Sequence, residues 1–558
     1  MSNPFPPNPT SKTGFYPIEI YEEALNRYPS VSELVRKKAE ENGDKTWLVF
    51  QDGDKYSYRD VDNLSNSLAT AFHQDGVRET DKVAIFALNS PEWILSYFGL
   101  LKIGATPVTV NTAFIKDPLI YNLKKSDSKY LVVDSRLIKA YKDVEDKLDN
   151  ISRLFIIGGN GIDPSLEPRK EYSFVNEMLN VNPDKSIQIQ KYWKDPSAMI
   201  LTSGTTGPSK VVVETNAQFI ATALLMVDAG GINANTVNYV YLPLFHIMAL
   251  DLSTLGTMLG NGKMILVERF STKFWDDVKK YKVTYFHAVG PILEMLLKQP
   301  STPAEKDHDK IIAHAYASKE IWNIAQERFN ILITGGYGGT EAGIPIAPTY
   351  DLVISGKVPA GSCGLVAPFI EVKIMDELGR FLPPNKVGEI VIRPSLPWTT
   401  FLEYYNMQEA TVKAFRGLWF HTGDAGYFDE NGFLYFVDRL KDAIRRKGEN
   451  ISSYEVEQIL LKNPRIQGTA VVPVKSEVGE DEVMAVIIPA SNDVTPEEIV
   501  KYSMENMPYF WVPRYIRLLD ALPRTPTGRI QKFVLRREGV TEDTYDMLEF
   551  IRKIRNNA

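Results

Sequence analysis

The chain has 558 residues, a formal net charge of −7 and an apolar content of 44%. This length exceeds what one hydrophobic core supports, so we expect two or more domains. The negative charge argues against a protein that binds nucleic acid by neutralising its phosphates. The single cysteine, Cys363, excludes an intrachain disulfide, and the six histidines lack the spacing of a zinc site.

The first 13 residues are polar and rich in proline. They lack the apolar core of a signal peptide and the arginine-rich amphipathic pattern of a presequence. No uninterrupted apolar run reaches the ~20 residues that span a bilayer. We therefore expect a cytoplasmic protein without a transmembrane segment.

Helical patterns alternate with short apolar strands through the first part of the chain. The spacing predicts helices over 31–42 and 58–72, a hairpin joining 47–50 to 55–58, and strands at 83–87, 108–110, 130–133 and 154–157. Ser90 precedes Pro91, a pair typical of a helix start. Alternation at this pitch predicts α/β layers with largely parallel sheets.

The most informative segment is a run of hydroxyls and glycines that ends in a lysine, Leu201-Thr202-Ser203-Gly204-Thr205-Thr206-Gly207-Pro208-Ser209-Lys210. Apolar runs at 198–200 and 211–213 flank it, which predicts a strand, a tight loop and a second strand. Glycines let backbone N–H groups approach a phosphate closely, and the lysine adds a positive charge. The spacing is not that of a Walker loop, because no Gly-Lys-Ser/Thr triplet closes it. A solvated turn is the alternative, but the two apolar neighbours favour an anion-binding loop.

A glycine-rich turn follows the strand predicted at 330–334 and reads Gly335-Gly336-Tyr337-Gly338-Gly339-Thr340-Glu341. Glycines admit a ligand, a tyrosine offers a stacking face, and a carboxylate can bind Mg²⁺ through oxygen. The turn is therefore a candidate nucleotide site. A Rossmann fingerprint is excluded, because Glu341 occupies the place of the third glycine.

Two further segments lie near predicted strand ends and are candidate parts of a pocket. His246 follows a strand at 239–242 and precedes a helical apolar stretch at 247–259. Its position alone is compatible with a structural role and with a functional role. Val289 lies beyond a strand at 283–286, where ligands of open α/β sheets bind, although core packing is the alternative there.

The pattern changes from Gly356 onward. Short strands at 371–375 and 389–392, separated by Gly- and Pro-rich turns, predict a small β-barrel. Asp424 ends another such strand, and after its Thr-Gly turn it could bind a ribose diol or cap the turn. The last hundred or so residues predict a compact α+β unit, with helices at 453–462 and 496–506 and strands at 469–474, 483–488 and 515–518.

Taken in order, these segments resemble those of the acyl-adenylate-forming enzymes, which comprise acyl-CoA synthetases, adenylation domains and luciferases. The resemblance covers most of the chain, and over 270–291 and 436–535 it is strongest to carnitine/crotonobetaine-CoA ligase-like members. It implies an α/β fold with a large N-terminal domain, 1–440, built of two α/β layered subdomains and a β-barrel at about 356–440. A small mobile α+β domain, 441–558, would follow, with Lys441 as the hinge.

The resemblance also implies a role for each residue that matches a motif. Those that would bind ATP are Thr202, Ser203, Gly204, Thr205, Thr206, Gly207, Lys210, Gly336, Tyr337, Gly338, Thr340, Asp424 and Arg439. Among them Tyr337 would stack on adenine, Thr340 would contact the α-phosphate with a catalytic role, and Asp424 would hold the ribose. Glu341 would hold Mg²⁺. Without the resemblance, Lys532 would be interpreted as a solvated surface charge. The resemblance implies that it is the catalytic lysine.

The acid and the thiol would meet other residues of the same motifs. His246 would gate or orient the carboxylate at the mouth of an acyl pocket, to which we also assign Phe245, Asp251, Val289 and Gly336. Asp251 could face a cationic group of the substrate, or it could lie at the surface or start of a helix. The loop with Lys447, Gly448 and Glu449 would contact the pantetheine arm of coenzyme A.

Three departures from the family pattern bear on these roles. Val211 stands where a glycine is usual, Asn216-Ala217-Gln218 replaces a usual His-x-Asn, and Lys447 replaces the first glycine of the CoA loop. The second departure argues against a ligand role at 216–218.

The sequence thus predicts an ATP-dependent, AMP-forming ligase that adenylates a short or medium carboxylic acid, polar or branched, and transfers the acyl group to coenzyme A. One alternative is a stand-alone adenylation enzyme that loads a carrier protein. Another is a nucleotide-binding sensor without turnover. A homodimer is one option for the assembly.

Overall fold

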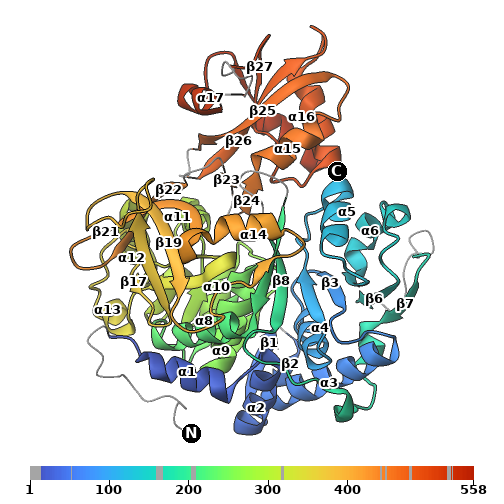
Figure 1. Ribbon diagram of the computed structural model, residues 1–558, viewed down its shortest axis with the longest axis vertical. Coiled ribbons are helices and arrows are strands. Elements are labelled where there is room, and N and C mark those ends of the chain that lie inside the picture. Colours follow the sequence, from blue (N-terminus) through green and yellow to red (C-terminus); the bar gives the residue numbers. More distant parts are fainter. Residues whose placement is uncertain are drawn as a thin grey trace. The chain divides into compact units, whose positions relative to one another are not determined.

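The computed structural model describes residues 14–51, 53–158, 168–202, 209–315, 319–439, 443–446, 449–476, 480–523, 530 and 532–557. The chain forms two compact units (Figure 1). The first comprises Met1–Thr112, Leu123–Leu201 and Val211–Asp438, and the second comprises Ala113–Asn122, Thr202–Lys210 and Arg439–Ala558. Every helix of the described residues is too short or too polar to cross a bilayer.

An eight-stranded sheet forms one part of the first unit, in the order β20-β9-β8-β4-β3-β5-β6-β7. Its strands are β3 (Lys82–Phe86), β4 (Thr106–Thr109), β5 (Tyr130–Asp134), β6 (Arg153–Ile157), β7 (Glu171–Phe174), β8 (Pro196–Thr202), β9 (Lys210–Thr215) and β20 (Glu403–Tyr404). The run from β8 to β7 is parallel throughout. β20 pairs antiparallel with β9 at the edge.

A seven-stranded sheet in the order β14-β13-β12-β10-β11-β1-β2 forms a second part. Its strands are β1 (Thr46–Phe50), β2 (Lys55–Ser57), β10 (Val237–Val240), β11 (Lys263–Leu266), β12 (Tyr285–His287), β13 (Ile311–His314) and β14 (Ile331–Ile333). All its pairs are parallel except the β1–β2 hairpin, which the sequence predicted. The prediction of largely parallel α/β layers is confirmed.

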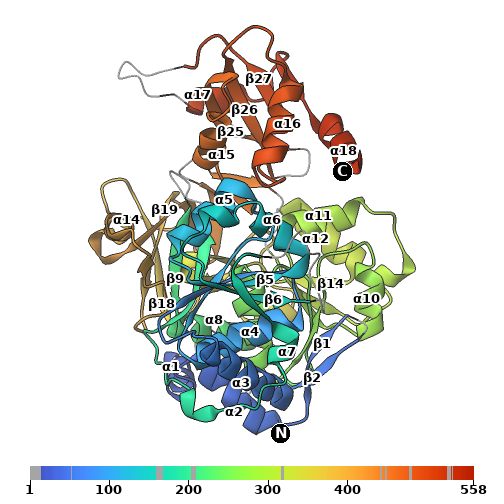
Figure 2. The same cartoon turned by 90° about the vertical axis from the view of Figure 1, so that its right-hand side faces the viewer.

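The helices of residues 14–439 follow in chain order. They are α1 (Ile18–Arg27), α2 (Val31–Asn42), α3 (Tyr58–Gln74), α4 (Pro91–Lys102), α5 (Lys116–Lys125), α6 (Ile138–Lys142), α7 (Val175–Met178), α8 (Asn216–Asp228), α9 (Gly256–Leu259), α10 (Phe274–Tyr281), α11 (Gly290–Lys298), α12 (Lys319–Phe329), α13 (Tyr350–Ile354) and α14 (Gln408–Ala414). Figure 2 shows α3 and α4 side by side below β5. Ser90 accepts a hydrogen bond from the Trp93 N–H, so it caps α4 as predicted. Helix α8 is buried at every position, so it lies inside the core.

The helical stretch predicted at 247–259 contains a π-helix. Segment η5 (Met248–Leu255) is π-helical and α9 continues it. The sequence does not distinguish an α-helix from a π-helix here, because a continuous apolar run has no polar positions that would mark the number of residues per turn. π-Helical segments are frequent at functional sites.

Short antiparallel sheets complete the first unit. One consists of β15 (Tyr337–Gly339), β16 (Gly343–Ala347) and β17 (Leu365–Val366), and the other of β18 (Ile370–Met375), β19 (Gly388–Pro394), β21 (Phe420–Phe428) and β22 (Leu434–Arg439). The predicted barrel is thus an open half-barrel.

Asp424 lies within β21 rather than at the end of a strand, which corrects the prediction. Gly423 adopts φ +74°, and the pairing of β19 with β21 shifts register between Glu389 and Val391. The Thr-Gly pair therefore forms a bulge inside one strand, and bulges commonly redirect a side chain.

The second unit contains the predicted C-terminal α+β domain. The hairpin β23 (Ala443–Arg446) and β24 (Glu449–Ser452) precedes a four-stranded sheet, β25 (Ile466–Lys475), β26 (Asp481–Pro489), β27 (Tyr515–Leu518) and β28 (Thr544–Asp546). Its helices are α15 (Ser453–Leu460), α16 (Pro496–Asn506), α17 (Lys532–Glu538) and α18 (Leu548–Asn557). Thr495 and Glu498 form a capping box that fixes the start of α16.

Candidate functional site

The glycine-rich turn after β14 requires glycine at position 336. Gly336 adopts φ +143°, and a Cβ there would lie 2.7 Å from Nε2 of His314. Any other residue would meet both a strained backbone and an imidazole ring. The turn therefore passes tightly over the end of β13 and delivers Tyr337 to the start of β15.

Tyr337 of β15 and Asp424 of β21 contact each other, although the two strands belong to different sheets. The Tyr337 hydroxyl donates to Oδ2 of Asp424 over 2.8 Å. The Tyr337 ring also stacks on Phe436 of β22, with 6.3 Å between ring centroids and 26° between planes. A half-buried aromatic face thus adjoins a carboxylate, an arrangement that suits a base and its ribose.

Glu341 follows this turn, and its side chain is also positioned by a tyrosine. Oε1 of Glu341 accepts a hydrogen bond from the Tyr404 hydroxyl at 2.9 Å. Burial and the Glu341 carboxylate both raise the pKa of Tyr404, so the phenol remains a donor. The Thr340 carbonyl accepts a hydrogen bond from Nε2 of Gln218 at 2.8 Å. Helix α8 and strand β20 therefore hold the turn from two directions.

The donor set at this turn fits Mg²⁺ better than a transition metal. Among the residues that the structure describes, no three His, Cys, Asp or Glu side chains gather into a metal site. A single carboxylate, as at Glu341, suits Mg²⁺, which is usually bound through one or two carboxylates together with substrate phosphates and water.

His246 lies on a well-anchored loop between β10 and η5. The Phe245 carbonyl accepts a hydrogen bond from Thr109 Oγ1 at 2.8 Å, and the Leu244 N–H donates to Oδ1 of Asn89 at 2.9 Å. The ring centroids of Phe245 and His246 are 4.5 Å apart. The imidazole is half-buried, so a rigid backbone presents it with part of its surface accessible.

Asp251 lies in the first turn of η5, as the alternative of a helix start expects, but it does not lie at the surface of that helix. It belongs to η5 and is 0% exposed, and neither of its carboxyl oxygens has a hydrogen-bond partner among the described residues. Burial raises the pKa of this carboxyl well above its ordinary value. Asp251 is therefore expected to be protonated and uncharged in the folded protein before a ligand binds.

Val289 lies beyond β12, as predicted, at the N-cap position of α11, where its side chain makes no capping hydrogen bond. Nearby, His287 and His314 are opposite one another in the β12–β13 register, with ring centroids 5.1 Å apart. His287 Nδ1 lies 2.8 Å from Ser253 Oγ and His314 Nδ1 lies 3.0 Å from Thr334 Oγ1. Burial lowers the pKa of His314 to about 4 and that of His287 well below its ordinary value, so both imidazoles are neutral.

Gly338 lies in β15 of the first unit, and the other remaining predicted residues belong to the second unit. Thr202 ends β8, Lys210 begins β9, and Glu449 begins β24. Lys532 is the first residue of α17, and its ammonium lies 2.6 Å from Oε1 of Glu457. The predictions for Ser203, Gly204, Thr205, Thr206, Gly207, Lys441, Lys447 and Gly448 fall outside the described residues, as does the side chain of Arg439.

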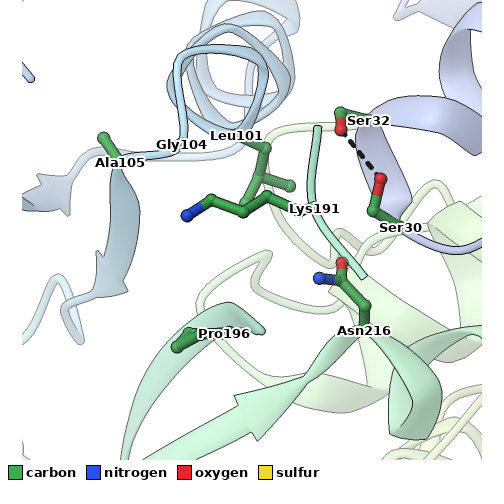
Figure 3. A pocket seen from close by; sticks show the side chains of 8 residues that line it. All are labelled: Ser30, Ser32, Leu101, Gly104, Ala105, Lys191, Pro196 and Asn216. Atoms are coloured by element: carbon green, nitrogen blue, oxygen red, sulfur yellow. Dashed lines mark hydrogen bonds between the residues drawn. The ribbon is translucent and has the colours of Figure 1, made fainter. Parts of the chain in front are cut away.

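A small hollow elsewhere in the first unit does not involve any of these residues. Ser30, Ser32, Leu101, Gly104, Ala105, Lys191, Pro196 and Asn216 line it (Figure 3). Asn216 is structural there, because its amide accepts from the Val31 N–H and donates to the carbonyls of Tyr192 and Asp195.

Comparison with known protein families identifies the family to which this chain belongs. The AMP-binding enzyme family matches residues 35–405, and the C-terminal domain of AMP-binding enzymes matches residues 455–529. The chain belongs to the AMP-binding enzyme family. A crotonobetaine/carnitine–CoA ligase of Shigella dysenteriae is 30% identical over 498 residues, which cover 88% of this chain and 95% of that protein.

Solved structures show the same fold. The o-succinylbenzoate CoA synthetase of Bacillus subtilis superposes with a TM-score of 0.77 at 22% identity, covering 91% of this chain and 98% of that one. A fatty acyl CoA synthetase of Mycobacterium tuberculosis has a TM-score of 0.64 at 25% identity, covering 91% and 98%. With the family match, they place this AMP-binding enzyme in the class of adenylate-forming CoA ligases.

Sequence reasoning missed several residues that support the site of this AMP-binding enzyme. Tyr404, Gln218 and Phe436 all contact predicted residues, yet they lie between 63 and 122 positions away from them in the chain. The sequence singled out only the segment of Gln218, and there the departure from the family pattern argued against a ligand role.

Proposed function

We propose that this AMP-binding enzyme adenylates a short or medium carboxylic acid, polar or branched, and passes the acyl group to coenzyme A. The observation that carries the proposal is that one glycine-rich turn supplies Tyr337, which bonds to Asp424, and Glu341, which Tyr404 holds, so a single unit offers an aromatic face, a ribose acceptor and a metal ligand. The acid class is supported by the relative named for crotonobetaine and carnitine, both small and polar acids.

The chemistry requires an activated acid, because a carboxylate has no good leaving group. A carboxylate oxygen attacks the α-phosphorus of ATP in line, the bond to the bridging oxygen breaks, and pyrophosphate departs. The product is an acyl-adenylate, and the thiol of coenzyme A then attacks its carbonyl and releases AMP. The protein contributes mainly positioning and charge neutralisation.

In the first step, Tyr337 and Asp424 would hold the adenine and ribose, and Thr340 would contact the α-phosphate. The phosphate loop from Thr202 to Lys210 would bind the β- and γ-phosphates. Glu341 would hold Mg²⁺, which would neutralise phosphate charge. His246 would orient the acid at the mouth of the acyl pocket.

Lys532 would neutralise the charge that develops between the carboxylate and the α-phosphate. The second step requires a thiol rather than a phosphate charge, so the same geometry does not suit both. We assign the change to a hinge at Lys441, which would remove Lys532 and bring the Lys447–Glu449 loop to coenzyme A. Lys441→Pro should then spare acyl-adenylate formation and impair thioester formation, whereas equal losses would refute the hinge.

The decisive experiment is a panel of carboxylic acids assayed for AMP release with and without coenzyme A. We expect release to depend on an acid and to produce a CoA thioester, with small polar or branched acids preferred. Lys532→Ala should lower acyl-adenylate formation by about 10²–10³-fold, as loss of a transition-state donor does. Pyrophosphate exchange without any CoA thioester would instead support the loading of a carrier protein.

A further inference from the structure

A carboxylate of the second unit holds the proposed catalytic lysine. The Lys532 ammonium lies 2.6 Å from Oε1 of Glu457 and donates to Oγ of Ser453 over 2.9 Å. Both charged side chains are largely shielded, with 19% of Lys532 and 12% of Glu457 exposed. A partly buried, hydrogen-bonded pair of this kind is stronger than an exposed ion pair.

The two partners form a receptor built on one helix. Ser453 and Glu457 are four residues apart on α15, so their side chains lie on the same face. Helices α15 and α17 both pack against β25 (Figure 2). This arrangement brings the first residue of α17 against the first turn of α15. We call Ser453 and Glu457 the α15 clamp.

Strand β25 fixes the clamp carboxylate in place. Among the described strands β25 is at the edge of its sheet, so its outward N–H groups face no neighbouring strand of that sheet. Oε1 of Glu457 accepts a hydrogen bond from the Val471 N–H at 2.6 Å, and the same oxygen faces Lys532. The carboxylate therefore cannot follow the lysine when the lysine leaves.

We propose that the α15 clamp holds Lys532 within its own domain and competes with its use in adenylation. The inference rests on the proposed function, because it assumes that Lys532 acts on the bound nucleotide and acid. To reach them, the ammonium must break its contacts with Glu457 and Ser453. Glu457 is thus a positioning residue that sets how often the lysine is available, and weakening it should favour the first half-reaction.

Glu457→Gln tests this, because the amide oxygen still accepts from Val471 while the charge is lost. Lysines of the full chain would be labelled by reductive methylation and followed by peptide mass spectrometry, with the exposed Lys475 as internal reference. We expect Lys532 to be labelled about tenfold faster relative to Lys475, as loss of a hydrogen bond to a charged group would give. Acyl-adenylate should form faster in a single turnover, while thioester formation from added acyl-adenylate should not change.

Asp493→Asn is the matched control, since it breaks an exposed contact with Arg465 in the same domain. It should alter neither labelling nor either half-reaction. Unchanged labelling of Lys532 in Glu457→Gln would overturn the proposal. Faster labelling with slower acyl-adenylate formation would also overturn it, because Glu457 would then assist the lysine. The proposed function is tested separately with Lys532→Ala. If that variant formed acyl-adenylate at the normal rate, the proposed role of Lys532 would be wrong, whatever the labelling experiment showed.

Discussion

The Tyr404 hydroxyl donates a hydrogen bond to the Glu341 carboxylate, although 63 positions separate the two residues in the chain. Tyr404 belongs to β20, the two-residue edge strand that pairs with β9. The edge of the eight-stranded sheet therefore sets the direction of the carboxylate proposed to bind Mg²⁺. Mutation of a residue that orients a metal ligand typically lowers metal affinity by about 10–100-fold.

Tyr404→Phe should therefore raise the Mg²⁺ concentration needed for half-maximal acyl-adenylate formation by about 10–100-fold. The ring still fills its buried site, so the fold should persist. The measurement is a Mg²⁺ titration of adenylation at saturating ATP and acid.

The matched control is Tyr405→Phe, at the next position. Its hydroxyl donates to Asp127 over 2.9 Å in an exposed contact. This variant should leave the Mg²⁺ titration unchanged. An unshifted titration in Tyr404→Phe would remove the tyrosine from the metal site.

Asp424→Asn should weaken recognition of the ribose. A neutral amide is a weaker acceptor than a carboxylate, so KM for ATP should rise by about 10–100-fold, in line with hydrogen bonds to charged groups. The wild-type enzyme should discriminate against 2′-deoxy-ATP or 3′-deoxy-ATP, and the variant should discriminate less. The measurement is KM for ATP and for both analogues.

Asp429→Asn provides the comparison for that series. Asp429 caps the turn between β21 and β22 by accepting from the N–H groups of Asn431 and Phe433. Its replacement should leave the discrimination between ATP and the deoxy analogues unchanged. If Asp424→Asn kept full discrimination, the proposed ribose contact would be wrong.

Local elements of this fold were readable from the sequence because short-range chemistry sets them. The β1–β2 hairpin and the Ser90 cap depend on residues within a few positions of one another. The motif residues of the site were likewise found through the resemblance. Their supports were not, because Tyr404–Glu341 and Lys532–Glu457 are contacts over 63 and 75 positions. The π-helix η5 was also hidden, since a buried apolar run has the same composition in either helix.

Asp251→Asn tests whether the buried carboxyl of η5 recognises a cationic substrate. Because the carboxyl is fully buried and its pKa is raised, it carries no charge before a ligand binds. We expect the ratio of kcat/KM between cationic and neutral acids to stay within about twofold of wild type. A selective loss of about tenfold or more for cationic acids, equivalent to ~1.4 kcal/mol, would identify Asp251 as their counter-ion.

Stability should depend on pH through Asp228, the last residue of α8. Oδ2 of Asp228 accepts hydrogen bonds from the Tyr16 N–H at 2.8 Å and from the Tyr21 hydroxyl at 2.9 Å. Burial nevertheless raises the pKa of this carboxyl to about 7, against 3.8 for an ordinary aspartate. The folded state therefore retains a proton that the unfolded chain releases, and the stabilising contribution is complete below about pH 4 and falls as the pH rises to about 7.

Asp228→Asn should remove this dependence while its amide oxygen still accepts from Tyr16 or Tyr21. Between pH 5 and pH 8 the variant should gain about 2–3 kcal/mol relative to wild type, because a pKa difference of one unit corresponds to ~1.4 kcal/mol. The measurement is the difference in Tm between variant and wild type at both pH values, at one heating rate. Asp149→Asn is the control, since Lys124 lowers the pKa of that exposed carboxyl and it stays ionised over this range. A Tm difference for Asp228→Asn that is the same at pH 5 and pH 8 would show that Asp228 is already ionised in the folded protein at pH 5.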